Sequence, residues 1–470
     1  MAPRTLEPIP IPQLTLWGLR GLTAIDPQLV PEMRGGGVIL LRGDRPVANA
    51  AAPPAEDAQA WGAAAAALAA AAWDGSGPVQ RAGTHGVVRS FFDELFNHLD
   101  PYSRYEPPED AAADHDRRSG EGGIGISLAT RGPAILVQSV IAEGPAASAG
   151  IRPGERLLAI NGRPIPGRDS AKAAALLAGP EETPVTITLR SRDGRVRRIE
   201  MRRALVPPET VFAEHDADML VLRITGFSRS TDRRVAHELT EGVAGPQHPR
   251  GIVFDLRANR GGLLRQAVAV TGTVLGTGPV ATTAGRDPEA DHAWEANGTD
   301  FSGGLPVVVL VDGRSASAAE IVAAALSDNG RAVVVGSTTL GKGLVQTIAP
   351  LPDGGELFVT WSRVLAPLGW PIQGLGVLPQ VCTSLGQDAL ARQLASLEQG
   401  RQPMQRALAL HAAARAPMPV AQMLDLRNAC PAAVGSDRDL QAAHVLIDAP
   451  ASYATALAPP PPLRRSAGRE

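Results

Sequence analysis

Short apolar runs recur between turn-rich stretches over residues 205–380, and this pattern constrains the fold more than any other feature of the 470-residue chain. Runs such as GIVFDLR, LPVVVLV and RAVVVG predict strands that are buried on both faces. Beside these runs we expect helices at 232–243, 263–270 and 316–326. Strands that alternate with helices predict α/β layering.

Turn residues and shifts in composition divide the chain into the segments 1–58, 59–118, 119–204, 205–385 and 386–470. The first segment mixes short apolar runs with Pro and Gly, and we expect a small, loosely specified region with a linker. The second contains an Ala-rich helix at 59–73 and an amphipathic helix at 84–99. Short strands and a helix at 169–177 predict a small, partly open barrel for the third. The last is Ala-rich and is expected to be partly helical, with a disordered Pro-rich end.

The composition argues against several classes of function. The net charge is −3 and aromatic residues make up only 4% of the chain, whereas nucleic-acid-binding proteins tend to carry a basic excess and aromatic stacking platforms. The most apolar stretch, at 60–73, is too short and too rich in Ala to span a membrane. The sequence has no H-E-x-x-H motif and only two cysteines, so neither an H-E-x-x-H zinc site nor a four-thiolate zinc site is expected.

The two cysteines, Cys382 and Cys430, do not form a C-x-x-C motif. They are interpreted either as a disulfide formed in an oxidising compartment or as two buried free thiols. The first residues contain prolines where the apolar region of a signal peptide would lie, so no secretion signal is visible. Either the protein is cytoplasmic or its true start lies upstream of Met1.

Three short stretches follow predicted strands, at the edge where α/β folds place their functional sites. The first, DLRANRGGLL, contains Gly261 and Gly262, whose backbone N–H groups can point into a site. The second, DGRSASAAE, places Ser317 at a strand-to-helix turn, where a helix N-terminus offers free N–H groups. The third, STTLGKGLVQ, places Lys342 between two glycines.

Ser317 and Lys342 together suggest a dyad for acyl transfer. A lysine acts as a general base only where its surroundings lower its pKa towards neutrality, and the serine then attacks a carbonyl. Backbone N–H groups stabilise the resulting oxyanion. Gln346 lies four residues after the lysine and would share a helical face with it if a helix begins there, which makes it the candidate that orients the lysine.

Each of these residues also has a simpler interpretation. Ser317 is alternatively a helix cap, the commonest role of serine at such a turn. The sequence GSTTLGK that ends at Lys342 fits the G-x-x-x-x-G-K pattern of a phosphate-binding loop, but Gly343 stands where the magnesium-binding hydroxyl belongs. Asp255 and Glu320 could form an acid pair, although we favour Asp255 as an acceptor of turn amides and Glu320 as a brace for the serine turn.

These motifs resemble those of the carboxyl-terminal processing (tail-specific) proteases, a family of Ser/Lys-dyad peptidases with a PDZ domain. SASAAE is similar to the family's S-A-S-A-S-E, TLGKGLVQ to T-F-G-K-G-x-V-Q, and DLRANRGGLL to D-L-R-x-N-x-G-G-L. HLDPYSRY matches the L-D-P-x-S-x-Y that precedes the family's PDZ domain. The resemblance covers about residues 84–380, and the spacing to Lys342 favours Ser317 over Ser315 as the nucleophile.

The resemblance implies a serine endopeptidase and a role for each site residue. Ser317 is expected to be the nucleophile, Lys342 the general base and Gln346 the residue that orients it. The N–H groups of Gly262 and Ala318 are expected to form the oxyanion hole. No metal or nucleotide is needed for this chemistry.

The resemblance also implies a fold and a substrate-binding module. The expected architecture is a multidomain α/β protein with helical flanking regions, in which a PDZ domain at 119–204, a small β-barrel, precedes a crotonase-like or ClpP-like protease domain at 205–385. The PDZ loop that holds a substrate's terminal carboxylate matches Gly123, Ile124, Gly125 and Ile126. The peptide would add as a strand, so we expect protein or peptide substrates with exposed, apolar C-termini.

Two features depart from the family's pattern. Ala178 stands where many members carry an Arg that helps couple the PDZ and protease domains, so gating by the PDZ domain is left open. Family members usually work in the cell envelope, and the resemblance therefore favours the periplasm although no secretion signal is visible. A catalytically inactive PDZ scaffold that binds peptides is the alternative function, and a homo-oligomer or an adaptor protein is left open as a partner.

Overall fold

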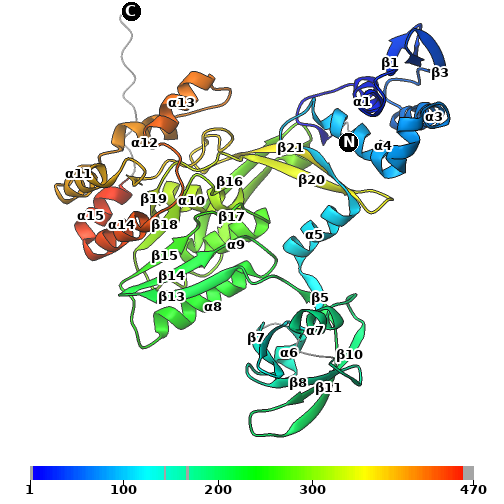
Figure 1. Cartoon of the computed structure of the whole chain (residues 1–470). Coiled ribbons are helices and arrows are strands. Elements are labelled where there is room, and N and C mark those ends of the chain that lie inside the picture. The colour runs from blue at the N-terminus through cyan, green and yellow to red at the C-terminus, as the bar shows by residue number, and fades with distance from the viewer. Residues whose placement is uncertain (1–3, 142–143, 166–168, 459–470) are drawn as a thin grey trace, which may run out of the picture.

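The centre of the molecule is a six-stranded sheet in the order β13-β14-β15-β18-β19-β22 (Figure 1). The computed structural model describes residues 4–141, 144–165 and 169–458. β13 is antiparallel to β14, and the later neighbours in the sheet are parallel, which confirms the predicted α/β layering. The strands are β13 (Val211–Asp216), β14 (Met219–Ile224), β15 (Gly251–Asp255), β18 (Val307–Val311), β19 (Ala332–Gly336) and β22 (Val381–Cys382).

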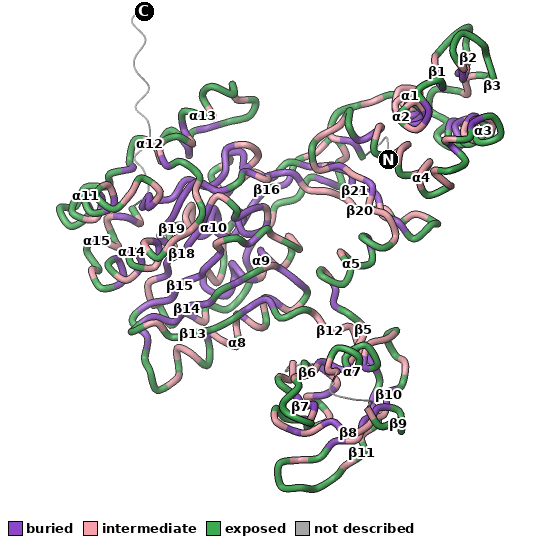
Figure 2. The backbone as a smooth tube through the Cα atoms, in the orientation of Figure 1, coloured by how far each residue is buried: buried purple, intermediate pink, exposed green. Residues whose placement is uncertain are grey.

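Both faces of this sheet are covered, because alternate residues of its strands face two different apolar cores. In β18, Val307 and Val309 belong to one core, whereas Val308 and Leu310 belong to the other. Figure 2 shows these central strands as the most continuously buried part of the chain. The first core is covered by α8 (Thr231–Ala244), α9 (Leu264–Leu275) and α10 (Ala318–Asp328), and the second by α11 (Gln387–Glu398), α14 (Asp437–Asp448) and α15 (Pro450–Leu457).

A second sheet, β17-β16-β21-β20, lies beside the first, and β4 pairs with β21 at its side. The pairing of β4 with β21 joins a segment that precedes the small barrel to the α/β domain that follows it. The strands are β4 (Arg104–Glu106), β16 (Thr277–Gly285), β17 (His292–Asn297), β20 (Leu344–Pro350) and β21 (Glu356–Leu365), and the short helix η2 (Pro288–Ala290) connects β16 to β17.

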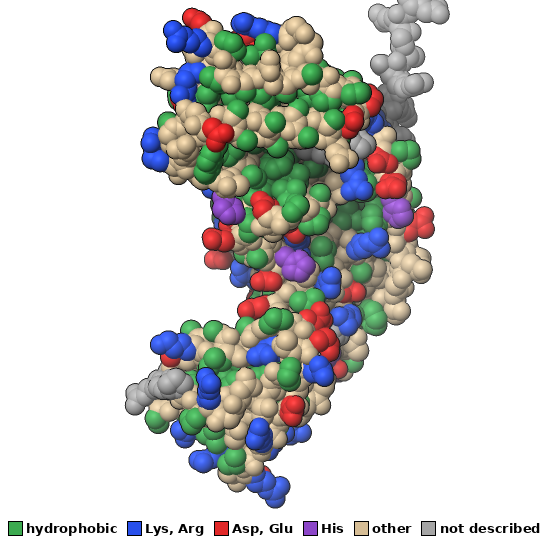
Figure 3. All heavy atoms as spheres, turned by 90° about the vertical axis from the view of Figure 1, so that its right-hand side faces the viewer, with side chains coloured by type: hydrophobic (Ala, Val, Ile, Leu, Met, Phe, Trp, Pro, Cys, Tyr) green, Lys and Arg blue, Asp and Glu red, His purple; other side chains and the backbone are tan. Residues whose placement is uncertain are grey.

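The predicted small barrel forms a separate lobe, which Figure 3 shows at the bottom of the molecule with many Lys and Arg side chains on its surface. Its strand order is β11-β10-β8-β7-β6, and β5 pairs with β12 where the chain enters and leaves the lobe. The linker helix α5 (Pro108–Ser119) leads into it. The elements are β5 (Glu121–Gly123), β6 (Ile126–Arg131), β7 (Ala134–Val140), α6 (Pro145–Ser148), β8 (Arg156–Ile160), β9 (Arg163–Pro164), α7 (Ser170–Leu177), β10 (Pro184–Arg190), β11 (Val196–Arg202) and β12 (Ala204–Val206).

The N-terminal segment is more regular than the sequence suggested, and the expectation of a loosely specified region over 1–58 is wrong. Two helices and a three-stranded antiparallel sheet pack on the Ala-rich helix α3 through a core that contains Leu40, Trp61 and Leu68. Each apolar run is too short to predict a folded unit on its own, because the core forms only when these helices and strands pack together. The elements are α1 (Ile11–Leu19), α2 (Gly21–Ile25), β1 (Leu29–Arg34), β2 (Gly37–Arg42), β3 (Arg45–Ala51), α3 (Ala58–Gly75) and α4 (Gly77–Phe96).

The C-terminal segment is helical, as expected, and it returns to the central sheet. Besides α11, α14 and α15 it contains α12 (Gln405–Ala412) and α13 (Val420–Asn428). Cys382, at the end of β22, is bonded to Cys430, so the disulfide interpretation holds and the free-thiol interpretation is wrong. The Pro-rich end that we expect to be disordered falls on 459–470, outside the described residues.

Candidate active site

Three parallel neighbours, β15, β18 and β19, bring their carboxyl ends to one edge of the central sheet. The loops that follow these strands carry the glycine pair, the serine and the lysine selected from the sequence. Their proximity is therefore a consequence of strand order, because parallel strands end on the same side.

Ser317 is the N-cap residue of α10, and its backbone has φ 57° and ψ −117°. A capping residue ordinarily has an extended backbone, and a positive φ is unfavourable for a residue with a Cβ. Such strain persists only where the surroundings hold it, and it is common at functional sites. Ser317 also forms a capping box with Glu320, so it does cap the helix, and its positive φ is what distinguishes it from an ordinary cap and favours a catalytic role.

Ser315 is fully buried and already engaged in the turn. Its hydroxyl donates to the carbonyl of Leu256 at 2.7 Å and accepts the N–H of Asp312 at 2.9 Å. It therefore ties the loops after β15 and β18 together, which supports the choice of Ser317 as the functional serine.

The glycine pair lies directly against the serine turn. A Cβ on Gly261 would lie 2.8 Å from Cβ of Ser317, and one on Gly262 would lie 2.2 Å from the carbonyl oxygen of Phe227, so neither position tolerates a side chain. The N–H of Gly261 donates to Asn259 at 2.8 Å. Within the described parts of the chain, the N–H groups of Gly262 and Ala318 have no acceptor, so both are available to a substrate oxygen.

Glu320 links the serine turn to the lysine loop. Its buried carboxylate accepts the N–H of Ser317 at 2.8 Å, the N–H of Gly341 at 2.6 Å and the N–H of Lys342 at 2.8 Å, and it also accepts the hydroxyl of Thr339. Burial raises its pKa, and these four donors oppose the rise because they favour the charged form. The predicted brace for the serine turn is confirmed. Asp255 accepts the N–H of Arg257 at 3.1 Å, as expected for an acceptor of turn amides, and it also accepts the Arg257 guanidinium. The hydrogen bonds of Glu320 in the described residues do not include Asp255.

The Lys342 side chain is partly buried. Burial lowers its pKa, and the positive charge of Arg104 lowers the pKa further. Its Nζ lies 5.0 Å from the centre of the Tyr102 ring. The described residues include no hydrogen bond between Nζ and the Ser317 hydroxyl, and the aromatic ring of Tyr102 is the contact recorded for Nζ.

Gln346 lies in the strand β20 rather than in a helix, so the helical face expected to join it to Lys342 does not form. Its amide nitrogen donates to the carbonyl of Leu344 at 3.2 Å and to the hydroxyl of Thr360 at 3.1 Å. Thr360 in turn donates to Asp100 at 2.7 Å. No hydrogen bond joins Gln346 to Lys342 among the residues described, and its role as the orienting residue stays a prediction.

The phosphate-loop interpretation of GSTTLGK is wrong. A phosphate-binding loop needs a helix after its lysine, because the helix N-terminus supplies the N–H groups that hold the anion. The chain continues from Lys342 into β20 instead. The N–H of Lys342 is also occupied by Glu320.

The sequence reasoning gave no individual role to several residues near the lysine. Asp100, Tyr102 and Arg104 reach it because β4 pairs with β21, and Asp100 and Arg104 both influence the pKa of Lys342. The available signal was the HLDPYSRY motif, which by itself is only a sequence match.

A groove in the small barrel contains all four residues predicted for carboxylate binding. The cavity is about 630 Å³ in volume and lies between the 123–126 loop and α7. Its lining includes Gly123, Ile124, Gly125, Ile126, Ala174, Leu177 and Ala178. Behind Ala178, the buried Arg203 donates to the carbonyls of Leu176 and Leu177 and so caps the end of α7.

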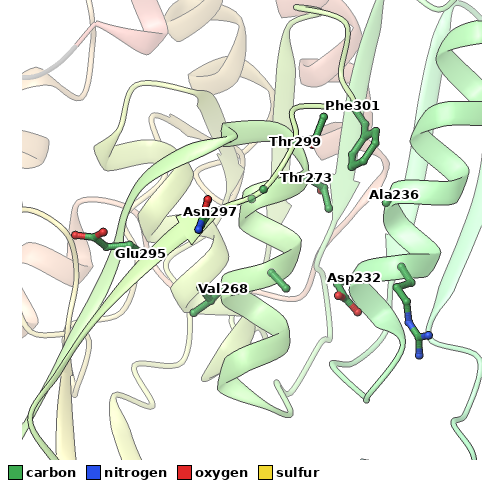
Figure 4. Close-up of a pocket in the computed structure, with 12 residues that line it drawn as sticks. Asp232, Ala236, Val268, Thr273, Glu295, Asn297, Thr299 and Phe301 are labelled. Carbon is green, nitrogen blue, oxygen red and sulfur yellow. The ribbon is translucent and has the colours of Figure 1, made fainter.

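Another cavity, of about 370 Å³, lies between α8, α9 and the segment after β17 (Figure 4). Asp232, Thr273 and Phe301 line it, and none of the residues at the edge of the central sheet contributes to it. The described residues contain no group of three or more His, Cys, Asp or Glu side chains placed to hold a metal ion. No helix in the described ranges has the length and apolar character needed to cross a membrane.

Family models match two parts of the chain. Residues 218–383 match peptidase family S41, and residues 136–191 match the PDZ domain. The first match contains the three loops at the edge of the central sheet, and the second falls within the small barrel.

Curated relatives carry consistent names. The chain is 36% identical over 300 residues to a carboxy-terminal-processing protease of Bartonella bacilliformis. The aligned region covers 63% of this chain and 69% of the relative. It is 33% identical over 305 residues to the carboxy-terminal processing protease CtpA of Bacillus subtilis, covering 64% of each. It is 34% identical over 293 residues to a probable CtpA-like serine protease of Staphylococcus aureus, covering 60% of this chain and 57% of the relative.

Among solved structures, the chain is similar to a photosystem II D1 C-terminal processing protease, with 24% identity and a TM-score of 0.39. The match covers 81% of this chain and 97% of that protein.

Proposed function

Because the chain belongs to peptidase family S41 and is a serine-type peptidase of the carboxy-terminal processing group, we propose that Ser317 is its nucleophile and Lys342 its general base. The observation that carries this proposal is the strained Ser317 turn, which lies against the glycine pair and is tied through Glu320 to the lysine loop. These are the parts that acyl transfer by a serine requires.

In the first step, the neutral amine of Lys342 takes the proton from the Ser317 hydroxyl as its oxygen attacks the peptide carbonyl. The N–H groups of Gly262 and Ala318 donate to the oxyanion that develops, and the N-terminus of α10 favours the same negative charge. The lysine then gives its proton to the leaving amine, and an acyl-enzyme remains. Water attacks the ester in a second round of the same proton transfers.

The lysine can serve as a base because burial makes its charged form unfavourable. Gln346 would hold the amine with its side-chain carbonyl. Its amide nitrogen is occupied by Leu344 and Thr360, which leaves the oxygen as the free acceptor. Because no hydrogen bond joins Nζ to the Ser317 hydroxyl in the described residues, the proposal requires the lysine amine to approach the serine before catalysis.

The groove of the small barrel would bind the C-terminal tail of the substrate. The 123–126 loop offers N–H groups to the terminal carboxylate, and β6 stands at the end of its sheet, where an extended peptide can add as a strand. Ile124, Ile126 and Leu177 make the groove apolar, which favours an apolar last residue. The substrates would be unstructured protein tails, since a peptide that adds to β6 as a strand must be extended.

The disulfide between Cys382 and Cys430 supports a location in an oxidising compartment, the periplasm or cell envelope. A homo-oligomer or an adaptor protein stays a prediction without a structural argument.

A cleavage assay on an unfolded protein with an apolar C-terminal tail tests the proposal. Wild type, Ser317→Ala and Lys342→Ala would be compared, with Lys172→Ala as the matched control, because Lys172 is the only other lysine of the chain and is exposed on α7. We expect cleavage by wild type and the control alone. Cleavage by all four would exclude this dyad. If all four proteins bind the tail and none cleaves it, the alternative function, a catalytically inactive PDZ scaffold that binds peptides, is favoured.

A further inference from the structure

The Lys342 side chain has an aromatic partner that the catalytic steps do not use. Its Nζ lies 5.0 Å from the centre of the Tyr102 ring, within the range in which an ammonium group is attracted to the face of an aromatic ring. Both side chains are partly buried, and such contacts are stronger where water is excluded. The ring attracts the ammonium form and has no comparable attraction for the neutral amine.

Tyr102 is held where it can make this contact. It follows Asp100, which accepts the N–H groups of Tyr102 and Ser103 at 3.0 and 3.1 Å and the hydroxyl of Thr360. Thr360 belongs to β21, so the turn that carries the ring is fixed to the sheet that follows the lysine loop. The position of the ring is therefore set by the same strands that set the lysine.

We propose that Tyr102 is a positioning residue that holds the ammonium group of Lys342 away from Ser317 in the free enzyme and releases it when substrate binds. The proposal rests on the proposed function, because it assigns a resting place to the general base. On release the lysine loses one proton to solvent, and the neutral amine then meets the Ser317 hydroxyl. The enzyme would thus keep its base protonated and separated from its nucleophile until a peptide is present.

Other charged groups also face the lysine and must be unchanged in the test. They are Arg104 of β4, Asp114 of α5, Glu320 of α10 and Asp100 of the turn before β4. Substitutions of Tyr102 leave all four in place. Tyr102→Phe keeps a ring, and Tyr102→Leu removes it while it keeps an apolar side chain.

The chain contains only two lysines, so selective ¹³C labelling at the lysine ε-carbon gives two side-chain signals. Lys172→Arg identifies the Lys342 signal. In the wild type and in Tyr102→Phe, we expect this signal to show the upfield shift caused by an aromatic ring. In Tyr102→Leu the shift should vanish, and the pKa measured from the signal should fall by about 0.4 to 1.5 units, because the ring no longer favours the ammonium form.

Release is tested in the Ser317→Ala protein, which is expected to bind a tailed substrate without cleaving it. Addition of a peptide with an apolar C-terminus should abolish the ring-induced shift of Lys342. A shift that persists at saturation would overturn the proposal, and so would its absence in the free wild type.

The pH dependence of cleavage gives a second readout. The profile of kcat/KM reports the free enzyme and that of kcat reports the complex. Tyr102→Leu should move the kcat/KM profile to lower pH by the same amount as the fall in the pKa of Lys342. The kcat profile should be unchanged. Equal movement of both profiles, or of neither, would contradict the proposal. Tyr105→Leu, three residues along the same segment, controls for loosening of β4, and thermal unfolding reports whether each variant is folded.

The failure of the proposed function is distinguishable from the failure of this inference. If Lys342→Ala still cleaves, the lysine is not the base, whatever its NMR signal shows. If Lys342→Ala is inactive and the Tyr102 variants leave the signal and the profiles unchanged, the dyad stands and the role of Tyr102 fails.

Discussion

The carboxylate of Glu320 accepts the backbone N–H of Lys342 at 2.8 Å, and the same oxygen accepts the N–H of Ser317 at 2.8 Å. One buried acceptor therefore fixes the backbone of both proposed catalytic residues. The two loops follow different strands, so this contact sets their relative position. The proposed approach of the Lys342 amine to Ser317 would therefore involve the lysine side chain and leave the backbone of both loops in place.

Glu320→Gln is expected to reduce kcat by about 10- to 100-fold, because an amide presents N–H groups to backbone donors and displaces the two loops. The loss of satisfied buried bonds should lower the free energy of unfolding by about 1 to 3 kcal/mol. Steady-state cleavage and denaturant unfolding measure the two effects. Glu295→Gln, at an exposed position of β17, should change neither, and full activity in Glu320→Gln would show that the brace is dispensable.

Gly261→Ala is expected to reduce cleavage by about 100-fold or more, since the new Cβ would lie 2.8 Å from Cβ of Ser317 and displace the nucleophile. The positive φ of 99° adds strain. Gly386→Ala is the matched control, because Gly386 has a similar φ of 95° but a Cβ added there would have no atom within 4 Å. Equal losses in the two variants would mean that backbone strain, and not contact with the serine, is responsible.

The stability of the protein is expected to rise with pH between about 4 and 6.5 on account of His411. Complete burial lowers the pKa of this imidazole to about 4, below the 6.5 of an exposed histidine. Between these values the unfolded chain binds a proton that the folded chain does not, so acid favours unfolding, by about 3 kcal/mol at the limit. Denaturant unfolding at several pH values measures the slope.

His411→Gln keeps a donor for the carbonyl of Gly376, which His411 contacts at 2.8 Å, and removes the titration. The difference in stability between wild type and variant should narrow as the pH falls towards 4. A difference that is constant over this range would contradict the assignment to His411.

Removal of the disulfide is expected to loosen the lysine loop. The residues after Cys430 cross the ends of the central strands: the carbonyl of Cys430 accepts the hydroxyl of Thr338 at 2.6 Å, and that of Ala433 accepts the N–H of Gly313 at 2.7 Å. Cys382→Ser with Cys430→Ser should lower the free energy of unfolding by about 2 to 4 kcal/mol, because the unfolded chain is no longer constrained.

The same double variant should also cleave more slowly than wild type, because the lysine loop is loosened. Cleavage by the two proteins is compared under non-reducing conditions. Reductant should change the unfolding midpoint of the wild type in denaturant but not that of the variant. An identical midpoint for the two proteins would mean that the bond contributes nothing to the native fold.

Amidation of the substrate's C-terminus is expected to raise KM by about 10- to 100-fold and leave kcat unchanged. The 123–126 loop would lose charge-assisted hydrogen bonds to a carboxylate, each worth about 1.5 to 3 kcal/mol. Paired peptides that differ only in this group measure the effect. Equal KM values would show that the groove does not read the terminus, and a change confined to kcat would place the carboxylate elsewhere.

The α/β layering and the candidate residues at the strand ends could be predicted from local patterns of amino acids. Runs such as that of β18 are apolar on every residue, so burial of both faces follows without knowledge of the partners. Short sequence patterns indicate where strands end and helices begin. The candidates Ser317, Lys342 and the glycine pair could therefore be selected from the sequence. The resemblance then assigned roles to them.

Which residues surround the lysine depends on the pairing of strands that lie far apart in the chain. The strand that contains Gln346 forms by pairing with β21, and this pairing overrides the helix allowed by local spacing. Tyr102 and Asp100 reach the site because β4 pairs with β21, which follows them by some 250 residues in the chain. The sequence likewise leaves the bond between Cys382 and Cys430 open, because the two cysteines meet only where the C-terminal helices pack on the sheet. Each of these contacts joins segments far apart in the chain, and their free energy comes from burial and pairing that no local pattern contains.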